Sequence, residues 1–348
     1  MCLSATARVS TLVFAKTEMA KIVLGIGTSH TPMLNLTSQQ WQHRAEVDYA
    51  NLKLNLSDGR FVSYPQLLAE RGPLYRDDVA LKVLEEKERA CQAALDKLGD
   101  ELALANPDLV IIVGDDQAEL FSPDNQPAFA VFHGEEIVTY PGKYAQGAPE
   151  WMRQVGRGYL MDDVYRLPGH PEMAMQLIEG LMDLDVDVSC VASVKDPSKA
   201  GFGHAYGFII KRLFRRSIPV VPVLLNTYFP PNVPTAARCY DVGSKLRSVI
   251  EAMPGDQRIA VIASGGLSHF VVDEALDLKV MQALKDNDAQ TLRNIPRQAL
   301  KSGSSETLNW ILTAGAVEAL PLSFAEYQPL YRTEAGTGVG AAFCAWRE

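Results

Sequence analysis

The stretch KIVLGIGTSHTPML, residues 21–34, decides the fold class. Its first half is apolar, with two glycines, which is typical of a strand buried on both faces. Its second half becomes polar at Ser29 and His30. A dinucleotide-binding fingerprint would place a third glycine where His30 stands. The stretch therefore predicts a buried strand that ends at a histidine instead of at a phosphate-binding loop.

Further apolar runs repeat this pattern along the chain, at 108–114, 129–132, 186–194, 219–226 and 258–266. Between them lie segments whose apolar residues recur every three or four positions, at 79–102, 171–183, 235–253, 274–288 and 306–320. Such spacing is typical of helices that pack one face on a core. The alternation predicts an α/β protein with a mixed, largely parallel sheet flanked by helices.

The chain shows no internal repeat and no linker rich in Pro, Gly or Ser, so we expect a single domain over residues 19–348. Residues 1–18 are expected to be a mobile extension, because Met19 begins a stretch that reads as a natural start. Residues 31–106 form a long insertion between the first two strands. Insertions of this length at a strand end are commonly lids or binding elements.

Composition narrows the range of partners. The 348 residues carry a net charge of −9, which argues against nucleic acid or anionic membranes. No apolar run reaches the roughly 18 residues of a membrane helix. The five cysteines are scattered without a Cys-x-x-Cys pair, which suggests reduced thiols and a cytoplasmic protein.

Polar residues follow four of the predicted strands. Ligands of open α/β sheets bind beyond the carboxyl ends of the strands, so these residues are expected to converge on one site. They offer groups that can bind a metal or move a proton: Ser29 and His30, Asp115 to Gln117, Asn226 to Tyr228, and Ser268 and His269.

Each histidine and acid also has a structural explanation. His30 can cap or pack, and His269 follows a Gly-Gly pair that permits close backbone approach. Glu306 opens a predicted helix, where an acid favours the dipole, and His170 precedes a helix that begins with proline. For the remaining histidines the surrounding sequence favours a structural role over a functional one: His43, His133 and His204.

Seven segments, in their order and spacing, resemble the class III extradiol ring-cleavage dioxygenases, the superfamily of the protocatechuate 4,5-dioxygenase β subunit. The resemblance covers most of the chain from Met19 onward and looks closest to the 3-O-methylgallate dioxygenase branch. The segments are GIGTSHTPML, PDLVIIVGDDQAELF, LPGHPEMAMQLI, LNTYFPPNVPTAARCYDVGSKLRSVIE, ASGGLSHF, SGSSETLNWILTAGA and YRTEAGTGVGAAF.

The resemblance implies a non-haem Fe(II) held by two histidines and one glutamate, with positions left open for substrate and oxygen. The first metal histidine falls on His30 and the glutamate on Glu306. The acid/base histidine falls on His269, and a further active-site histidine falls on His170. We expect Tyr228 and Asn226 to line the substrate pocket.

One position departs from the family pattern. The second metal histidine of the family falls on Gln117, whose amide oxygen is a weaker donor than imidazole. Three explanations stay open. Gln117 ligates the metal or positions a bound water; another group, such as His133, His204 or Asp116, fills the site; or the iron site is lost.

The sequence thus predicts an Fe(II)-dependent extradiol dioxygenase that opens a catechol- or gallate-type aromatic acid with O2. His269 would move the phenolic proton. By family resemblance we expect a homo-oligomer. The alternative is a non-catalytic relative that binds an aromatic ligand or a partner. A hydrolase ranks last, because neither a Gly-x-Ser-x-Gly nor a His-Glu-x-x-His motif is present.

Overall fold

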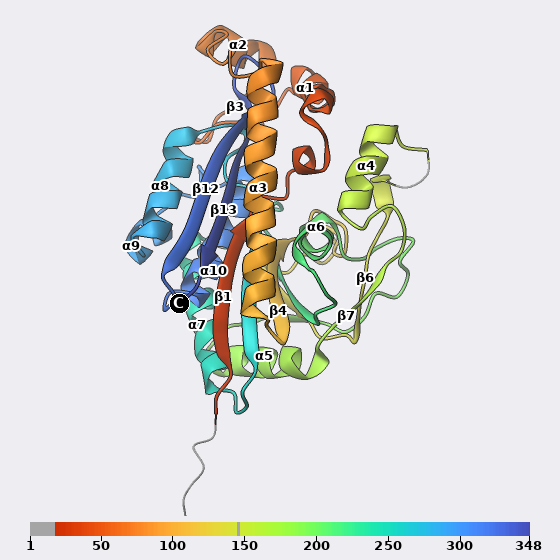
Figure 1. The fold of residues 1–348 in the computed structure, drawn as a ribbon, viewed down its shortest axis with the longest axis vertical. Helices are drawn as coiled ribbons and strands as arrows, with labels where there is room; N and C mark the ends of the chain where they lie inside the picture. Colours follow the sequence, from red (N-terminus) through yellow and green to blue (C-terminus); the bar gives the residue numbers. More distant parts are fainter. Residues whose placement is uncertain (1–17, 145–146) are drawn as a thin grey trace, which may run out of the picture.

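A nine-stranded mixed sheet forms the centre of the protein, whose computed structural model describes residues 18–144 and 147–348 (Figure 1). The expected extension over residues 1–18 falls, apart from Glu18, outside the described residues. The strands lie in the order β11 (His269–Val271), β13 (Thr337–Trp346), β1 (Lys21–Thr28), β10 (Arg258–Ser264), β4 (Leu109–Asp115), β9 (Val220–Leu225), β5 (Phe129–Phe132) and β8 (Ser189–Val191), with β12 (Leu322–Tyr331) paired to β13.

The four central strands run parallel and end level with one another. Thr28 of β1 pairs with Ser264 of β10, and Asp115 of β4 pairs with Leu225 of β9. Strands β13 and β5 join this core antiparallel. The prediction of an α/β domain with a mixed, largely parallel sheet is therefore confirmed.

Alternate residues of the central strands feed two separate cores. Ile111 and Val113 of β4 point into one core, and Val110 and Ile112 into the other. This two-sided burial explains why the strand sequences are apolar without alternation.

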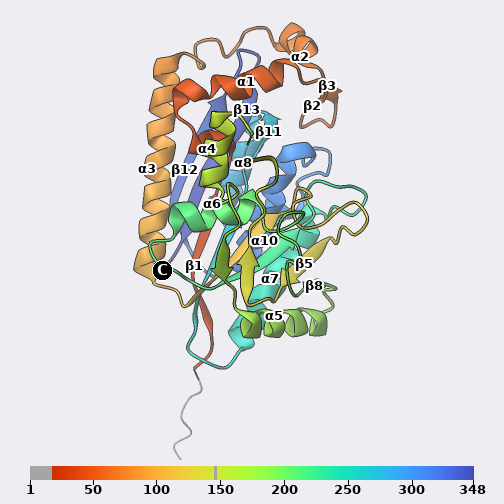
Figure 2. The ribbon, with the colours of Figure 1, turned by 90° about the vertical axis from the view of Figure 1, so that its right-hand side faces the viewer.

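Helices cover both faces of the sheet (Figures 1 and 2). One core is closed by α5 (Pro171–Asp183), α7 (Ala236–Ala252), α8 (Glu274–Lys285), α9 (Ala289–Arg293) and α10 (Thr307–Ala316). The other is closed by α3 (Leu81–Ala105), α4 (Glu150–Gly158) and α6 (His204–Leu213). The smaller elements are α1 (Gln42–Tyr49), α2 (Tyr64–Arg71), the strand pairs β2 (Leu54–Asn55) with β3 (Phe61–Val62) and β6 (Glu136–Val138) with β7 (Arg166–Pro168), and the 3-10 turns Pro32–Asn35, Ser38–Gln40, Gly142–Tyr144 and Ser302–Glu306.

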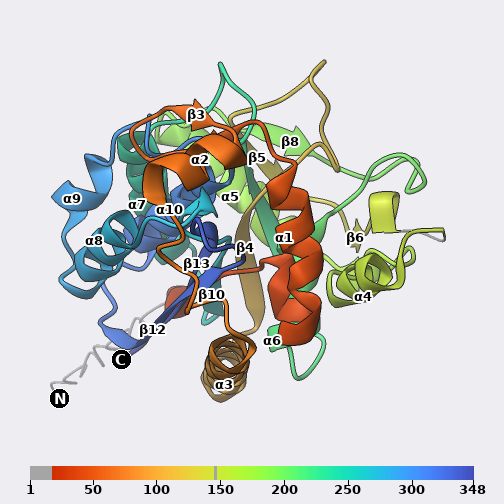
Figure 3. The same ribbon diagram turned by 90° about the horizontal axis from the view of Figure 1, so that it is seen from above.

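The insertion after β1 divides into two parts. Its first part carries α1 and α2, which lie across the end of the molecule opposite α5 (Figures 1 and 3). Its second part is α3, whose Leu95, Leu98 and Leu102 belong to the core against the sheet. Only the first part lies over the carboxyl ends of the strands, so the lid-like description suits only that part.

The C-terminal hairpin of β12 and β13 and the helix α6 have no counterpart among the sequence-based expectations. Strand β13 is buried along its whole length and lies between β1 and β11. Its sequence, TGVGAAFCAW, is rich in Gly and Ala and poor in the β-branched residues that usually mark a strand. In the part of the chain that the structure describes, no helix combines the length and apolarity needed to cross a membrane.

Helices α7 and α10 cross in backbone contact. A Cβ atom placed on Gly243 would lie 1.8 Å from the carbonyl oxygen of Leu312, which belongs to the fully buried α10. A backbone carbonyl cannot move aside, so only glycine fits at this crossing. The contact fixes the position of α10, and with it the position of Glu306 just before the helix.

We expect Gly243→Ala to lower the free energy of unfolding by about 1–3 kcal/mol, because overpacking outweighs the gain in helix propensity. Urea denaturation measures this change. Gly99→Ala in α3 is the matched control. A Cβ at Gly99 meets only the guanidinium end of Arg215, which can swing away, so stability should stay unchanged or rise. Equal losses in both variants would contradict the backbone contact.

Candidate functional site

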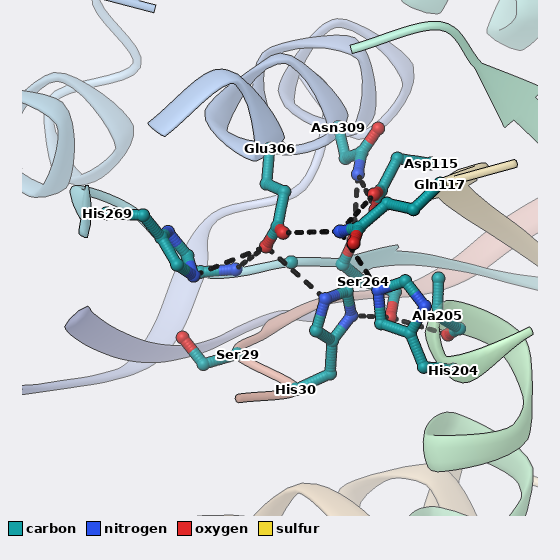
Figure 4. A network of polar contacts seen from close by, with 12 residues as sticks. Ser29, His30, Asp115, Gln117, His204, Ala205, Ser264, His269, Glu306 and Asn309 are labelled. Atoms are coloured by element: carbon teal, nitrogen blue, oxygen red, sulfur yellow. Dashed lines mark hydrogen bonds and ion pairs between the residues drawn. The ribbon is translucent and has the colours of Figure 1, made fainter. Parts of the chain in front are cut away.

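Four buried side chains with metal-binding atoms converge at the carboxyl ends of the central strands (Figure 4). His30 follows β1, Asp115 ends β4, His204 begins α6 and Glu306 directly precedes α10. One ligand atom from each lies within 4.8 Å of the others. The imidazole rings of His30 and His204 meet edge to face with centroids 4.5 Å apart. Two imidazoles with carboxylates form a donor set that suits a first-row divalent metal.

A serine fixes which nitrogen of His30 is free. Nδ1 of His30 lies 2.9 Å from Oγ of Ser264, and this hydroxyl donates its hydrogen to the carbonyl oxygen of Ala205 at 2.6 Å. The serine oxygen must therefore accept, so Nδ1 of His30 carries the proton. Nε2 keeps its lone pair and lies 3.3 Å from Oε2 of Glu306.

His204 is oriented in the same way by Glu119. Nδ1 of His204 donates to Oε1 of Glu119 at 2.7 Å, which leaves Nε2 directed toward the cluster. Burial on its own lowers the pKa of His204, but the Glu119 carboxylate outweighs burial and raises the pKa to about 9. A Cβ at position 203 would lie 2.0 Å from the Glu119 carboxyl group, so glycine lets this carboxylate keep its place against His204.

His269 lies on the other side of Glu306 from His204 (Figure 4). Its Nδ1 donates to the carbonyl oxygen of Leu267 at 2.9 Å, and its Nε2 lies 3.7 Å from Oε2 of Glu306. The Ser304 hydroxyl accepts from the backbone N–H of His269 at 2.8 Å and donates to its carbonyl oxygen at 2.7 Å. Burial lowers the pKa of His269.

Glu306 carries the central charge of the site. Burial on its own raises the pKa of this carboxyl group, but His269, His30 and His204 outweigh burial and lower the pKa to about 2. Its Oε2 also accepts the backbone N–H of Gly266 at 2.7 Å. Glu306 is therefore ionised at neutral pH.

Gln117 lies among the cluster residues and is half-buried. Its amide nitrogen is 3.1 Å from Oδ2 of Asp115, 3.3 Å from Nε2 of His204 and 3.4 Å from Oε1 of Glu306. The amide nitrogen thus lies within 3.4 Å of a polar atom of three of the four cluster residues.

Of the three groups considered as substitutes at this position, the structure brings only His204 into the cluster. Asp116 accepts the backbone N–H groups of Leu120 and Phe121 instead. His133 follows β5 and lies outside both the cluster and the cavity described next.

A cavity of about 290 Å³ opens over the cluster, at the small end of the range for ligand pockets. Its walls combine the cluster with aromatic rings and two arginines. The lining residues are His30, Thr31, Pro32, Arg44, Gln117, Tyr144, Trp151, Met152, Val155, Tyr159, His204, Tyr228, His269, Phe270, Glu306 and Arg332.

The two residues expected in the substrate pocket differ in their placement. Tyr228 lines the cavity. Asn226 does not, because its amide accepts the backbone N–H of Phe229 and donates to the carbonyl oxygen of the same residue, both at 2.8 Å. Asn226 therefore forms the turn that presents Tyr228.

His170, for which an active-site role is expected, lies outside the cluster and the cavity lining. This residue precedes α5, and its Nδ1 accepts the backbone N–H of Met173 at 3.2 Å. Its neighbour Gly169 bridges to Val220 at the start of β9, whereas the cluster lies at the strand ends. His170 is absent from the cavity lining, so the helix-capping explanation describes its place.

Sequence reasoning missed three groups at the site: Glu119, Arg44 and Arg332. Glu119 lies two residues beyond Gln117. Its contact with His204 could not be predicted, because the two residues are 85 positions apart in the sequence. Arg44 comes from α1, which carried no recognisable site motif, and Arg332 lies in the segment YRTEAGTGVGAAF, for which the resemblance named no site residue.

The known proteins to which this chain is similar in sequence are dioxygenases that act on aromatic compounds. The family described as "Catalytic LigB subunit of aromatic ring-opening dioxygenase" matches residues 79–344. Gallate dioxygenase of Pseudomonas putida is 27% identical over 168 residues, which cover 45% of this chain and 48% of that protein. The 2,3-dihydroxyphenylpropionate/2,3-dihydroxicinnamic acid 1,2-dioxygenase of Photorhabdus laumondii is 26% identical over 185 residues, 53% of this chain and 50% of that protein. The chain spans about half the length of these curated relatives.

We expect Ser264→Ala to lower the free energy of unfolding by about 1–3 kcal/mol, because it leaves the His30 Nδ1–H buried without an acceptor. Chemical denaturation of the metal-free protein gives the value. Ser248→Ala, which removes an exposed hydroxyl in α7, should change stability by less than about 0.5 kcal/mol. A near-zero effect of Ser264→Ala would argue against the proton placement on His30.

Proposed function

Because the chain belongs to the family of the catalytic LigB subunit of aromatic ring-opening dioxygenases, we propose that it opens a catechol-type aromatic ring with O2 at an Fe(II) centre. The family match confirms the resemblance seen in seven sequence segments. The observation that carries the proposal is the convergence of His30, His204, Asp115 and Glu306 beneath a small cavity.

The donor set fits Fe(II). An acceptor holds the Nδ1 proton of each imidazole, so Nε2 is the nitrogen that would bind the metal. On metal binding, His204 would lose the Nε2 proton that its raised pKa keeps in place at neutral pH. Together with Glu306 the two imidazoles make two histidines and one carboxylate, the pattern of non-haem Fe(II) oxygenases. In this proposal His204 supplies the imidazole that the family pattern places at position 117, and Asp115 lies close enough to be a fourth ligand.

The bound metal would supply a Lewis-acid and redox centre at which the two ring hydroxyls and O2 can meet. His269 acts beside it as the acid/base. Its Nδ1 is committed to the Leu267 carbonyl, so proton exchange runs through Nε2, which lies at the cavity wall near Glu306. This atom takes the proton from a phenolic hydroxyl as the substrate binds and can return it later in the reaction.

The cavity walls hold the ring and exclude water. Trp151, Tyr159, Tyr228 and Phe270 contribute aromatic surface around the cluster. Tyr159 also donates its hydroxyl hydrogen to the carbonyl oxygen of His30 at 2.6 Å, which fixes the backbone of a proposed ligand. A cavity of about 290 Å³ suits a substrate with a single substituted ring.

The relatives are named for gallate and for 2,3-dihydroxyphenylpropionate or dihydroxycinnamic acid. We propose the same class for this chain, an aromatic acid with neighbouring hydroxyl groups. The homo-oligomer, the cytoplasmic location and the 3-O-methylgallate branch stay predictions.

Gln117 supports a second candidate function, a non-catalytic protein that binds an aromatic ligand. Its amide N–H groups face Asp115, His204 and Glu306 at 3.1–3.4 Å. The amide can donate its two hydrogens to the Asp115 and Glu306 carboxylates, the groups that a cation would otherwise contact. The two candidates differ in whether the wild-type protein binds Fe(II).

We expect His204→Ala to weaken Fe(II) binding by more than about 100-fold, because loss of an orienting partner alone costs about 10–100-fold and loss of the ligand costs more. Anaerobic titration against a coloured chelator measures the affinity. His133→Ala is the matched control and should bind Fe(II) like the wild type, since this ring lies outside the cluster and the cavity.

Two results would count against this assignment. Unchanged affinity in His204→Ala would remove His204 from the metal site. A wild-type protein that fails to bind Fe(II), together with a Gln117→Ala variant that gains binding, would favour the non-catalytic candidate. On the enzymatic proposal, Gln117→Ala changes Fe(II) affinity much less than His204→Ala does.

We expect His269→Ala to reduce kcat by about 100-fold or more, because the proton carrier is lost, while the iron content stays near that of the wild type. His269→Phe should behave alike, since it keeps a ring but carries no proton. The assay binds gallate anaerobically, adds O2, and follows oxygen uptake and the ring-opened product. Wild-type kcat in either variant would exclude His269 from proton transfer.

A further inference from the structure

Two arginines line the same cavity as the candidate metal cluster, although the function proposed above assigns them no part. Arg44 belongs to α1, which lies across the carboxyl ends of the strands (Figures 2 and 3). Arg332 follows β12 and comes from the opposite end of the sequence. Both residues line the cavity together with His269 and Glu306.

Arg332 is a buried cation with only part of its guanidinium engaged. Its side chain is 2% exposed, and its Nε lies 2.7 Å from Oδ2 of the equally buried Asp48. Its Nη2 is also buried and has no hydrogen-bond partner among the described residues. A guanidinium stays charged in a protein and presents its donors as a rigid fork. Asp48 therefore faces only part of the Arg332 guanidinium, and Nη2 of this charged group is left without an acceptor.

Arg44 adds a second cation without a matching acid. Its Nε is buried without a hydrogen-bond partner, and no carboxylate in residues 18–144 or 147–348 forms an ion pair with it. Asp48 thus balances one of two guanidinium charges. The carboxylates of Glu306 and Asp115 are engaged with the histidine cluster and with Gln117. This part of the cavity wall is positive, in a chain whose net charge is −9.

We propose that Arg332 and Arg44 form the binding site for the carboxylate of the aromatic substrate, with Asp48 as the positioning residue that holds Arg332 in place. The inference rests on the proposed function for the ring hydroxyls, which would face the histidine cluster. A carboxylate is planar and anionic, and its two oxygens match the paired donors of a guanidinium. It would supply both the acceptors that Nη2 of Arg332 and Nε of Arg44 lack and the negative charge that the wall lacks.

Because Arg44 and Arg332 line the cavity, we expect them to determine which aromatic compounds bind there. An analogue without the carboxylate would leave buried, charged donors unpaired, and sites built around a charged group discriminate strongly against such analogues. Gallate and pyrogallol form a matched pair of probes, since they carry the same three hydroxyls and differ only in the carboxylate. Their dissociation constants, measured by anaerobic calorimetry with the Fe(II)-loaded protein, isolate the contribution of this group.

We expect the wild type to bind gallate at least about 10-fold more tightly than pyrogallol. Arg332→Met and Arg44→Met should each weaken gallate binding by about 10- to 100-fold and leave pyrogallol binding nearly unchanged. Arg76→Met is the matched control. Arg76 is exposed, pairs with Glu334 and lies outside the cavity, so both affinities should remain those of the wild type.

One further variant, together with Arg44→Met, separates loss of the carboxylate site from misfolding. Arg332→Met leaves Asp48 buried without a partner, so the double variant Arg332→Met with Asp48→Leu removes both charges together. Arg44→Met leaves the Arg332–Asp48 pair intact. In either variant, circular dichroism and iron content like those of the wild type, together with a lost preference for gallate, support the proposal.

Equal binding of gallate and pyrogallol by the wild type would overturn the carboxylate site and leave ring opening standing. Equal weakening of both ligands in folded Arg44→Met would also overturn it, because a carboxylate site cannot act on pyrogallol. A wild type that prefers gallate and yet consumes no O2 would overturn the proposed dioxygenase function and leave the carboxylate site standing.

Discussion

The buried carboxylate of Glu306 is the charge on which the arrangement of the site depends. Removing a carboxylate from water costs several kcal/mol unless charged or hydrogen-bonding groups replace the solvent. Here the replacements are the Gly266 amide, the Gln117 amide and the rings of His30 and His269. These partners follow β1, β4 and β10, so the carboxylate is stable only where these strands end together.

The parallel register of the sheet provides that meeting point. Thr28 pairs with Ser264 at the ends of β1 and β10, and the antiparallel strand β13 closes the outer side of β1. Glu306 itself is held from the other direction, because α10 lies against the backbone of α7 at Gly243. A change in either the strand register or the helix crossing would separate the carboxylate from the groups that balance it.

Much of this could be predicted from the sequence, for a definite reason. Residues that directly follow buried parallel strands must share one edge of the sheet, so His30, Gln117 and His269 could be expected near one another. Glu306 came from the family resemblance. The roles of His204 and Arg332 escaped a firm prediction, because α6 and β12 did not stand out as elements and because pairs such as His204 with Glu119 form only in three dimensions. The helix-capping contact of His170 depends on the local backbone before α5, which the family resemblance did not address.

The three histidines differ in the group that accepts the hydrogen bond from Nδ1. Nδ1 of His204 faces a full carboxylate, that of His30 a hydroxyl and that of His269 a backbone carbonyl. A carboxylate behind an imidazole makes the opposite nitrogen a stronger electron donor than a neutral acceptor does. In the proposed metal centre, the rings of His30 and His204 would therefore be electronically unequal, with one strong and one weak nitrogen donor. That inequality is set by Glu119 and Ser264, neither of which belongs to the cluster itself.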